Sequence, residues 1–434
     1  MKHTLNLNIL GLGPSATLAI NERSNALLRQ GREVYKLGLG QSPFPVPHCV
    51  VEALKENAHQ KDYQPVRGLE PLREAVAEFH RKKDGLDCSA ADVLIGPGSK
   101  ELMFLLQLVY YGELVIPNPS WVSYAPQAQI IGRPVRWVLT RPEADWCLSG
   151  QDLERICQEN PDKPRLLILN YPNNPVGNCY SDEMLEEIAG VARKYGVVVL
   201  ADEVYSLMHH GAEPTSIARF YPEGTIVSSG LSKWCGAGGW RLGTFVFPKK
   251  LRVLLDALAV AASETFTSTS APIQYAAICA FKGGPEIDRY LSLSRRLVTA
   301  LTGYFYEQLV GAGCTLSRPQ GGFYLFPSFA HISKQLNDSG IHTSNDLAEN
   351  LLDDTGVATL GGSHFGVPEH KFNLRLAIVN FDGGKALAAI DGLADDAILD
   401  ESFLREHCSD VVRASELIVK WVEAVRTGGE RRVG

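Results

Sequence analysis

The feature that most constrains the fold is a series of short apolar runs separated by stretches with helical periodicity. Seven such runs stand out: Val93–Ile95, Leu114–Pro117, Val135–Leu139, Leu166–Leu169, Val197–Ala201, Ile226–Ser229 and Thr244–Phe247. The intervening stretch Ser181–Tyr195 repeats apolar residues at helical spacing: Leu185, Ile188, Ala189 and Ala192. This alternation predicts the α/β class, with a mostly parallel seven-stranded sheet covered by helices.

The length of the chain indicates more than one domain. It has 434 residues, 45% of them hydrophobic, which is enough for one large and one smaller core. A long helix expected over Asp288–Leu309 joins the sheet to a smaller α/β unit that contains Gly321–Pro327 and Asn373–Phe381. We expect residues 1–50 to be an N-terminal segment packed on the small domain, residues 51–300 to be the large domain, and residues 301–434 to be the small C-terminal domain.

Composition excludes several functional classes. The net charge of −7 gives no bulk attraction to nucleic acid or to an anionic membrane, so neither is expected as a partner. The nine cysteines are odd in number and lack C-x-x-C spacing, so neither a disulfide framework nor a metal site is expected, and a reducing, cytoplasmic location is predicted. No run is long enough for a transmembrane helix, and the N-terminus lacks a signal-peptide core.

Polar residues follow several of the apolar runs, beginning at Ile95–Leu106. There a Gly-Pro-Gly turn leads into an apolar-periodic stretch that starts near Ser99. The first turn of a helix offers free N–H groups and a positive dipole end, which favour a phosphate, although the same residues suit an ordinary helix cap. After the next run, Trp121 either stacks on a flat ring or lies in the core.

Two further polar sets follow the fourth and fifth apolar runs. Residues 169–177 read LNYPNNPVG, a rigid turn in which Asn174 is able to donate to a ligand oxygen, although a turn needs no function. Asp202 ends an apolar run where an unpaired carboxylate is costly to bury, so it either has a cationic partner or caps a helix. Tyr205, three residues further on, is able to face the same site.

The strongest signal is Val227–Gly243, with the sequence VSSGLSKWCGAGGWRLG. Lys233 follows a buried run after a turn of small residues, and Arg241 comes eight residues later. A partly desolvated lysine has a lowered pKa and a nucleophilic amine that reacts with an aldehyde. The planar fork of arginine suits a phosphate, and the glycines let the backbone pass close to a ligand. The segment therefore indicates a nucleophilic lysine beside a phosphate site.

The order of these motifs resembles that of the class I/II pyridoxal-phosphate-dependent aminotransferases of fold type I, the aspartate-aminotransferase-like family. The resemblance runs from about Leu37 to Phe381 and so covers most of the chain. LGLGQSPFPVP, residues 37–47, is similar to the substrate-entry loop of that family, and YQPVRGLEPLREAVA, residues 63–77, to its glycine-turn-helix. Seven motifs carry the resemblance, in this order: Gly-Ser-Lys, Trp, Asn-Asn-Pro-x-Gly, Asp-x-x-Tyr, a Ser-x-x-Ser-Lys-like loop, Gly-Trp-Arg and a late Asn-x-Arg. Chance agreement of seven ordered motifs is improbable.

The resemblance implies a role for each matching residue. The catalytic residues are then Lys233, which carries pyridoxal 5'-phosphate as a Schiff base and later acts as general base, Asp202, which pairs with the pyridinium nitrogen, and Tyr205. The implied cofactor contacts are the backbone of Gly98, Ser99 and Lys100 with Arg241 at the phosphate, Trp121 on the ring face, and Asn174 with Tyr205 at the phenolic oxygen. The implied substrate contacts are Arg375 at the α-carboxylate, the backbone of Gly40, and Asn174.

The resemblance also implies a homodimer, because Tyr63 would reach the phosphate only from a neighbouring chain. One departure from the family pattern stands three residues before Lys233, where many relatives place a phosphate-binding serine and this chain has Gly230. Either Ser229 or Ser232 is able to replace it.

The reaction implied is amino transfer from an L-amino acid to a 2-oxo acid. Two alternatives stay open at this point: a β-elimination lyase on the same fold, and a non-catalytic aminotransferase-like regulatory or binding protein. The latter is disfavoured because Lys233, Asp202 and Arg241 are all present and no helix-turn-helix is recognisable before the first motif.

The side chain of the donor gives a last hypothesis. Relatives that prefer dicarboxylic amino acids often use a second cation, and the segment that looks equivalent, residues 263–277, contains no Arg or Lys. A second buried carboxylate without a partner would be strongly rejected. The sequence therefore favours a donor with a neutral side chain, in a pocket walled by Phe44, Tyr124 and Phe365. The alternative is that Arg23, Arg67 or Lys36 supplies the charge.

Overall fold

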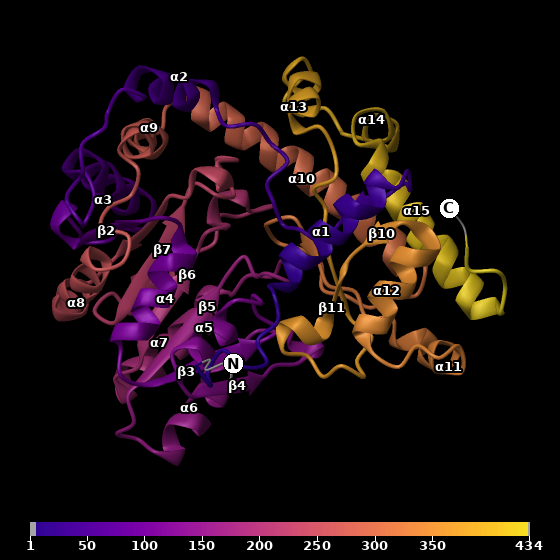
Figure 1. Cartoon of the computed structure of the whole chain (residues 1–434), viewed down its shortest axis with the longest axis horizontal. Coiled ribbons are helices and arrows are strands. Elements are labelled where there is room, and N and C mark those ends of the chain that lie inside the picture. The colour runs from indigo at the N-terminus through magenta and orange to yellow at the C-terminus, as the bar shows by residue number, and fades with distance from the viewer. Residues whose placement is uncertain (1–5, 433–434) are drawn as a thin grey trace, which may run out of the picture.

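The structure, a computed structural model, describes residues 6–432, and its central feature is a seven-stranded sheet in the order β2-β8-β7-β6-β5-β3-β4 (Figure 1). The strands are β2 (Val93–Gly96), β3 (Glu113–Asn118), β4 (Val135–Leu139), β5 (Arg165–Asn170), β6 (Val198–Asp202), β7 (Thr225–Gly230) and β8 (Gly243–Val246). Neighbours are parallel except where β8 pairs with β2 and β7. The predicted α/β class and mostly parallel seven-stranded sheet are confirmed, and each strand begins and ends within one residue of its predicted run.

Helices cover both faces of this sheet, because alternate strand residues point to opposite sides. Ile116, Ile168 and Leu200 pack on one side with apolar residues of α4 (Ser99–Val109), α5 (Tyr124–Ile130) and α8 (Arg252–Ser263). Val115, Leu167 and Val199 pack on the other with those of α6 (Gly150–Glu159) and α7 (Asp182–Tyr195). The helix predicted over 181–195 is confirmed.

A helical layer at the β2 side of the sheet continues into one long helix. It consists of α2 (His48–Asn57), α3 (Glu70–Asp84) and α9 (Ala271–Lys282), which contact one another. The long helix α10 (Pro285–Gly311) follows α9 and crosses to the other part of the molecule in Figure 1. The expected helix over 288–309 is therefore confirmed, and it extends by two to three residues at each end.

The remaining elements form a smaller α/β unit. Its strands are β1 (Tyr35–Lys36), β9 (Tyr324–Leu325), β10 (Val357–Ala358), β11 (Leu360–Gly361) and β12 (Leu374–Ala377), with β1 parallel to β10 and β12 between β11 and β9. Its helices are α1 (Ala16–Arg29), α11 (Ser333–Asp338), α12 (Ser344–Thr355), α13 (Gly383–Asp391), α14 (Glu401–His407) and α15 (Ser409–Thr427). Figure 1 shows α1 between the sheet and this unit. The domain boundaries at residues 50 and 300 stay a prediction.

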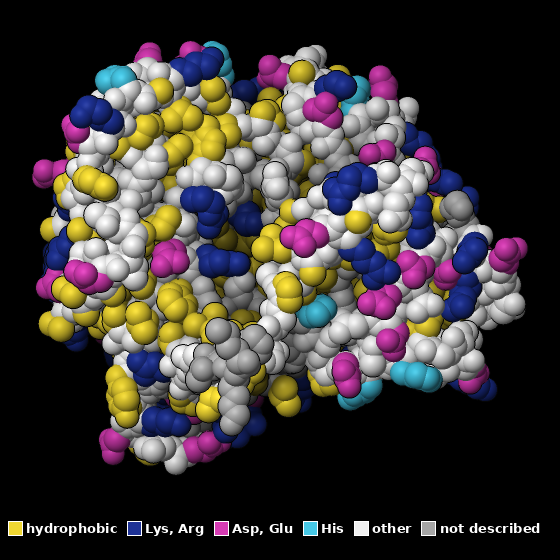
Figure 2. Space-filling view, in the orientation of Figure 1, with side chains coloured by type: hydrophobic (Ala, Val, Ile, Leu, Met, Phe, Trp, Pro, Cys, Tyr) yellow, Lys and Arg dark blue, Asp and Glu magenta, His cyan; other side chains and the backbone are white. Residues whose placement is uncertain are grey.

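Two properties of the surface bear on function. A hollow separates the sheet part from the smaller unit, and Lys and Arg side chains gather around it (Figure 2). Within residues 6–432, no helix combines the length and the apolar character that crossing a membrane requires.

Candidate active site

Lys233 lies in the loop that follows β7, at the C-terminal edge of the parallel strands. Its Nζ donates a hydrogen bond to the carbonyl oxygen of Gly40 at 2.6 Å and lies 5.3 Å from the centre of the Tyr205 ring. Removal from water, and then the positive charge of Arg375, lower the pKa of Lys233 to about 7, while Asp202 opposes this shift. A large fraction of the amine is therefore in its neutral, nucleophilic form near neutral pH.

Asp202 is the last residue of β6 and is 4% exposed. Tyr124 donates a hydrogen bond from its hydroxyl to Oδ2 of Asp202 at 2.5 Å, whereas Oδ1 is buried with no partner among residues 6–432. Burial raises the pKa of Asp202 to about 6, although the hydrogen bond from Tyr124 opposes the shift. A buried carboxylate oxygen without a donor needs one from a ligand.

Arg375 lies on β12 and is 1% exposed, so its guanidinium is held by the protein on most sides. NH2 donates to the carbonyl oxygen of Gly38, and NH1 lies 3.5 Å from Oδ1 of Asn174. The guanidinium carbon stands 5.0 Å from the Tyr324 ring centre, and Nε has no partner among the described residues. No carboxylate of the described chain pairs with this cation, which leaves it to bind an acidic ligand.

A second cationic pocket forms where α4 begins. Gly98 caps α4 with φ at +89°, and a side chain there would collide with the guanidinium of Arg241. Arg241 itself has φ at +54° and donates from NH1 to the carbonyl oxygen of Gly238 at 2.9 Å. The first N–H groups of α4 at Ser99 and Lys100 have no acceptor within their own helix. Free N–H groups beside a guanidinium form an anion-binding site.

A stack of three side chains connects these two regions. Nζ of Lys100 lies 5.0 Å from the Trp121 ring centre, and the Trp121 and Tyr124 rings meet edge to face at 5.3 Å. Because the hydroxyl of Tyr124 reaches Asp202, the stack runs from the start of α4 to the end of β6.

Two tyrosines of different chain regions close the other side. The hydroxyls of Tyr205 and Tyr324 lie 2.8 Å apart, and any side chain at position 40 would collide with the Tyr324 hydroxyl. Asn174, which is 3% exposed, is positioned by the side chain of Asn170, whose Oδ1 accepts from the Asn174 backbone N–H at 2.8 Å. A compact site thus forms between β5, β6, the loop after β7, and β12.

Comparison with known proteins identifies the family. The family described as aminotransferase class I and II matches residues 32–387. An aspartate aminotransferase of Bacillus sp. (strain YM-2) is 30% identical over 377 residues, covering 85% of this chain and 93% of that protein. An asparagine–oxo-acid transaminase of Streptococcus mutans is 30% identical over 385 residues, covering 86% and 94%. The chain belongs to the aminotransferase class I and II family.

Solved structures agree with this assignment. The aspartate aminotransferase of Thermus thermophilus, with maleate, has a TM-score of 0.82 and 26% sequence identity, covering 96% of this chain and 99% of that one. The predicted family and fold type I are confirmed, and the chain is an enzyme of amino transfer. The lyase and the non-catalytic alternatives are not favoured by these relatives.

The cofactor implied by this aminotransferase family is pyridoxal 5'-phosphate, and the residues present fit it. The unpaired Oδ1 of Asp202 is suited to an N–H of a planar ring, and the guanidinium of Arg241 beside the first N–H groups of α4, next to a Gly98 that leaves no room for a side chain, is suited to a phosphate. Six of the residues expected at the site converge: Lys233, Asp202, Tyr205, Asn174, Arg375 and Gly40. The other expected residues, Gly98, Ser99, Lys100, Trp121 and Arg241, lie around the start of α4.

For two of the expected residues, Tyr63 and Ser232, the structure shows no contact within residues 6–432 that fixes a role. Tyr63 is 90% exposed and has no contact with the site within its own chain. Ser232 is half-buried in the loop before Lys233, and Ser229 is 6% exposed in β7, so which serine replaces the one absent at Gly230 stays a prediction.

The expected walls of the donor pocket stay a prediction. Tyr124 lies beneath Trp121 with its hydroxyl on Asp202, Phe44 packs on Phe381 at 5.9 Å, and Phe365 lies 5.3 Å below the Arg375 guanidinium. None of the three lines the cavity into which Lys100 extends. Sequence reasoning also gave no role to Tyr324, although it noted the segment 321–327 that carries it; its repeated aromatic residues after two glycines were the available signal.

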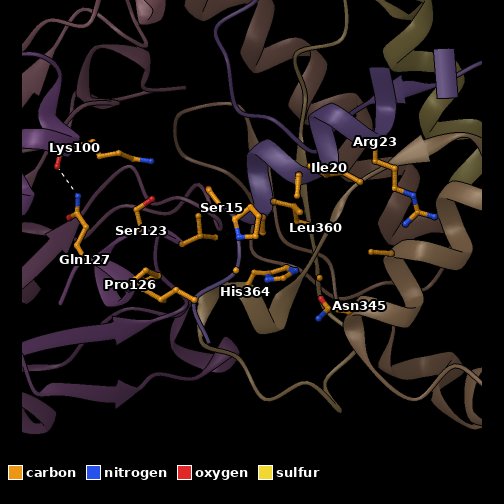
Figure 3. A pocket seen from close by; sticks show the side chains of 18 of the residues that line it. Ser15, Ile20, Arg23, Lys100, Ser123, Pro126, Gln127, Asn345, Leu360 and His364 are labelled. Atoms are coloured by element: carbon orange, nitrogen blue, oxygen red, sulfur yellow. Dashed lines mark hydrogen bonds between the residues drawn. The ribbon is translucent and has the colours of Figure 1, made fainter. Parts of the chain in front are cut away.

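That cavity, of about 1130 Å³, lies between α1, α4, α5, α12 and β11 (Figure 3). Lys100 extends into it from α4, and its Nζ has neither a hydrogen bond nor a carboxylate partner among the described residues. Burial, and then Arg241, lower the pKa of Lys100. At the other end of the cavity Arg23 is already paired, with Asp353 at 3.2 Å and Glu349 at 3.7 Å.

Proposed function

We propose that this enzyme binds pyridoxal 5'-phosphate and transfers the amino group of an L-amino acid with a second carboxylate to a 2-oxo acid. The observation that carries the proposal is the convergence of three charged groups: the Lys233 amine, the unpaired oxygen of Asp202 and the unpaired guanidinium of Arg375. A reactive amine, an acid for a ring nitrogen and a cation for a carboxylate are the groups that this chemistry requires.

Apart from Tyr63 of the partner chain, the chain's own groups would supply the cofactor contacts. Asp202 Oδ1 would accept from the ring nitrogen, and the Trp121 ring would cover one face of the cofactor. Tyr205 and Asn174 would hydrogen-bond its phenolic oxygen, and the phosphate would take the α4 N–H groups of Ser99 and Lys100 with Arg241 and Ser232. When bound, the protonated ring withdraws electrons from the donor's Cα and makes its proton acidic.

Lys233 is the group that moves this proton. Its pKa of about 7 leaves a large neutral fraction, so Nζ is able to take a proton from Cα of the donor and later to return it. The hydrogen bond to the Gly40 carbonyl oxygen fixes Nζ on the side of the site where Arg375 lies. The Tyr205–Tyr324 pair packs beside Nζ and excludes water from that side.

Arg375 would bind the α-carboxylate of the donor and of the oxo acid. Its Nε is unpartnered, and its other nitrogens are oriented by Gly38 and Asn174. The guanidinium therefore has a fixed orientation in which it is able to bind the two oxygens of a carboxylate. Because the same contact serves both substrates, Arg375 orients the donor without choosing its side chain.

Lys100 is the group we assign to the second carboxylate. The other cations considered from sequence are engaged: Arg23 with two acids, Arg67 with Asp256, and Lys36 with Asn25 at 2.6 Å. Lys100 is unpaired and lines the cavity between α1, α4, α5, α12 and β11. We refer to this cavity as the donor cavity. This assignment replaces the neutral-donor hypothesis, which rested on the absence of a cation from residues 263–277 alone. Relatives named as aspartate and asparagine transaminases, and a similar structure with maleate, support the same donor class.

A half-reaction screen tests the proposal. The loaded enzyme is mixed with aspartate, alanine, methionine or phenylalanine, and the product is assayed as oxo acid or as an eliminated fragment. We expect the 2-oxo acid and a specificity constant highest for aspartate. Release of ammonia with an unsaturated product would instead support the lyase, and preference for all three neutral donors would restore the hypothesis from sequence.

The proposed assembly is a homodimer in which Tyr63 of one chain completes the phosphate site of the other. In its own chain this tyrosine is 90% exposed, which is unusual for so large an aromatic side chain. Sedimentation at assay concentration should give a dimer. Tyr63→Phe should weaken cofactor binding several-fold and leave the dimer intact. An active monomer would contradict the assembly.

The cytoplasmic location also stays a prediction, supported by nine unpaired cysteines in the described chain.

A further inference from the structure

A second hollow, of about 460 Å³, is lined by none of the residues of the reaction centre or the donor cavity. Its wall comes from three regions of the chain: His209–Gly211, which follow the short helix η3 (Ser206–Met208), the stretch of α10 from Arg295 to Ala300, and Ala397–Leu399 before α14. No acidic residue is among the lining residues.

Arg295 brings a full positive charge to this hollow. Its NH1 donates to Nε2 of His209 at 2.6 Å, while Nδ1 of His209 donates to the carbonyl oxygen of Gly211 at 2.6 Å. A ring that accepts at one nitrogen and donates at the other is neutral. Burial, and then Arg295, lower the pKa of His209, which agrees with this state. The histidine therefore orients the guanidinium without neutralising it.

Arg296, the next residue, adds a second unneutralised charge. Its NH2 donates to the carbonyl oxygen of Ala397, whereas NH1 is buried and has no partner among residues 6–432. Neither arginine lies within ion-pair distance of a carboxylate in this part of the chain. Two adjacent guanidinium groups, one with a buried unsatisfied nitrogen, are costly unless a ligand supplies an acceptor.

None of the acids that flank the lining segment pairs with these arginines: Asp396 and Asp400 make no ion pair within the described residues, and Asp400 instead accepts from the Phe403 N–H as the cap of α14. Asp391 and Asp395 precede the segment that lines the hollow, and both accept from Arg289, at 2.8 Å and 2.5 Å. The hydrogen bond from Arg289 holds the pKa of Asp395 below its usual range. The chain thus pairs Arg289 of α10 with two acids and leaves Arg295 and Arg296 without an ion pair within the described residues, although the charge of Arg296 also contributes to the lowered pKa of Asp395.

We propose that Arg295 and Arg296 form a binding site for a small organic anion, with a phosphate or carboxylate group held by the two guanidinium forks. Arginine binds both groups through paired N–H donors, so the head group is defined by its oxygen atoms. The hollow exceeds the size of a lone phosphate, and Ala300, Ile398 and Leu399 supply apolar wall. The ligand therefore carries an apolar body beside its charged group.

Backbone contacts connect this site to the reaction centre. His209 pairs with Gly321 in an isolated β-bridge, His210 N–H donates to the Gln320 carbonyl oxygen at 2.8 Å, and Gly322 N–H donates to that of Met208 at 2.9 Å. Gly322 is next to Phe323, whose ring lies 5.8 Å from Nζ of Lys233. A ligand that orders residues 209–211 would order these contacts as well.

Calorimetric titration of the cofactor-loaded enzyme tests the site, with inorganic phosphate, phenyl phosphate and benzoate as probes. We expect one site per chain, phenyl phosphate to bind more tightly than phosphate, and Arg295→Gln and Arg296→Gln each to weaken it about tenfold or more. Arg318→Gln is the matched control, because it removes the same charge from a surface pair with Glu307 and should leave the affinity unchanged. The head group is identified by the probe, phenyl phosphate or benzoate, whose affinity falls more in Arg295→Gln and Arg296→Gln.

Hydrogen exchange on the wild-type enzyme gives a second measurement that needs no variant. Phenyl phosphate should slow exchange at the amides of His210 and Ala397, which flank the two arginines. Equal affinity for wild type and both glutamine variants would overturn the proposal, as would binding that survives in them and disappears in Arg375→Ala. An unchanged exchange rate at both amides under saturating probe would overturn it too.

Discussion

The reaction centre and the donor cavity lie side by side but are built differently. The reaction centre is assembled at the ends of strands and from backbone turns, so Lys233, Asp202 and Asn174 have few directions in which to point. The donor cavity is bounded by four helices and one short strand, and its polar side chains, such as Lys100, are long and free. The comparison indicates that the sheet positions the residues that react, whereas the helices around it position the residues that select the substrate.

The largest effect should come from the reaction centre itself. Lys233→Ala removes the general base, and amino transfer should fall by at least about 10³-fold. Borohydride reduction should link the cofactor to the wild-type chain at residue 233 and to no residue of the variant, as read by peptide mass spectrometry. Lys249→Ala, which removes a surface lysine paired with Asp87, is the control and should keep full activity. An undiminished rate in Lys233→Ala would remove the lysine from the mechanism.

Arg375→Ala should have the second largest effect, because it removes one charged contact with each of the two substrates. We expect KM for donor and oxo acid to rise by about 100-fold, with cofactor affinity nearly unchanged. Arg375→Lys keeps the charge without the fork and should recover part of the loss. Steady-state kinetics with each substrate varied measures this, and an unchanged KM for either substrate would contradict the shared role.

Lys100→Met sharpens the contrast between the two regions. The specificity constant for aspartate should fall about tenfold, while that for alanine should stay within a factor of about two. A fall of equal size for both donors would mean that Lys100 belongs to the reaction centre and not to the donor cavity.

Tyr124→Phe should have the smallest effect. It removes the hydrogen bond that stabilises the charged form of Asp202, so the pKa of this carboxyl, already raised to about 6 by burial, should rise further. The carboxylate then takes up a proton at higher pH, and its stabilisation of the ring nitrogen is lost sooner as pH falls. A pH titration of the bound cofactor's absorbance should show its acid transition moved upward, with kcat reduced only a few-fold. Tyr110→Phe, which removes a hydroxyl that donates to the Arg165 carbonyl oxygen at 3.1 Å, is the control.

The same contrast explains what the sequence could predict. Apolar runs gave every strand of the large sheet to within a residue, because strand ends coincide with changes from apolar to polar residues. The polar residues directly after them, Asn174, Asp202 and Lys233, fall into one site because parallel strands end at a common edge.

The donor cavity could not be predicted in this way. Its members come from residues 9 to 364, and helix packing alone decides which of them face one another. The contact of Tyr124 with Asp202 was not predicted, because an aromatic residue in the first turn of a helix gives no sign of whether its hydroxyl meets a substrate or Asp202. Lys100 was considered only for its backbone, because the glycines before it indicated a phosphate site.

The long helix α10 has a consequence for how this chain tolerates changes in length. Its 27 residues extend about 40 Å as one rod. Near its start, Glu286 accepts from the Cys49 backbone N–H at 2.8 Å, and further along it packs on α13 and α15. One inserted residue would advance everything after it by about 1.5 Å and rotate it by about 100°. Insertions and deletions should therefore be excluded from residues 285–311.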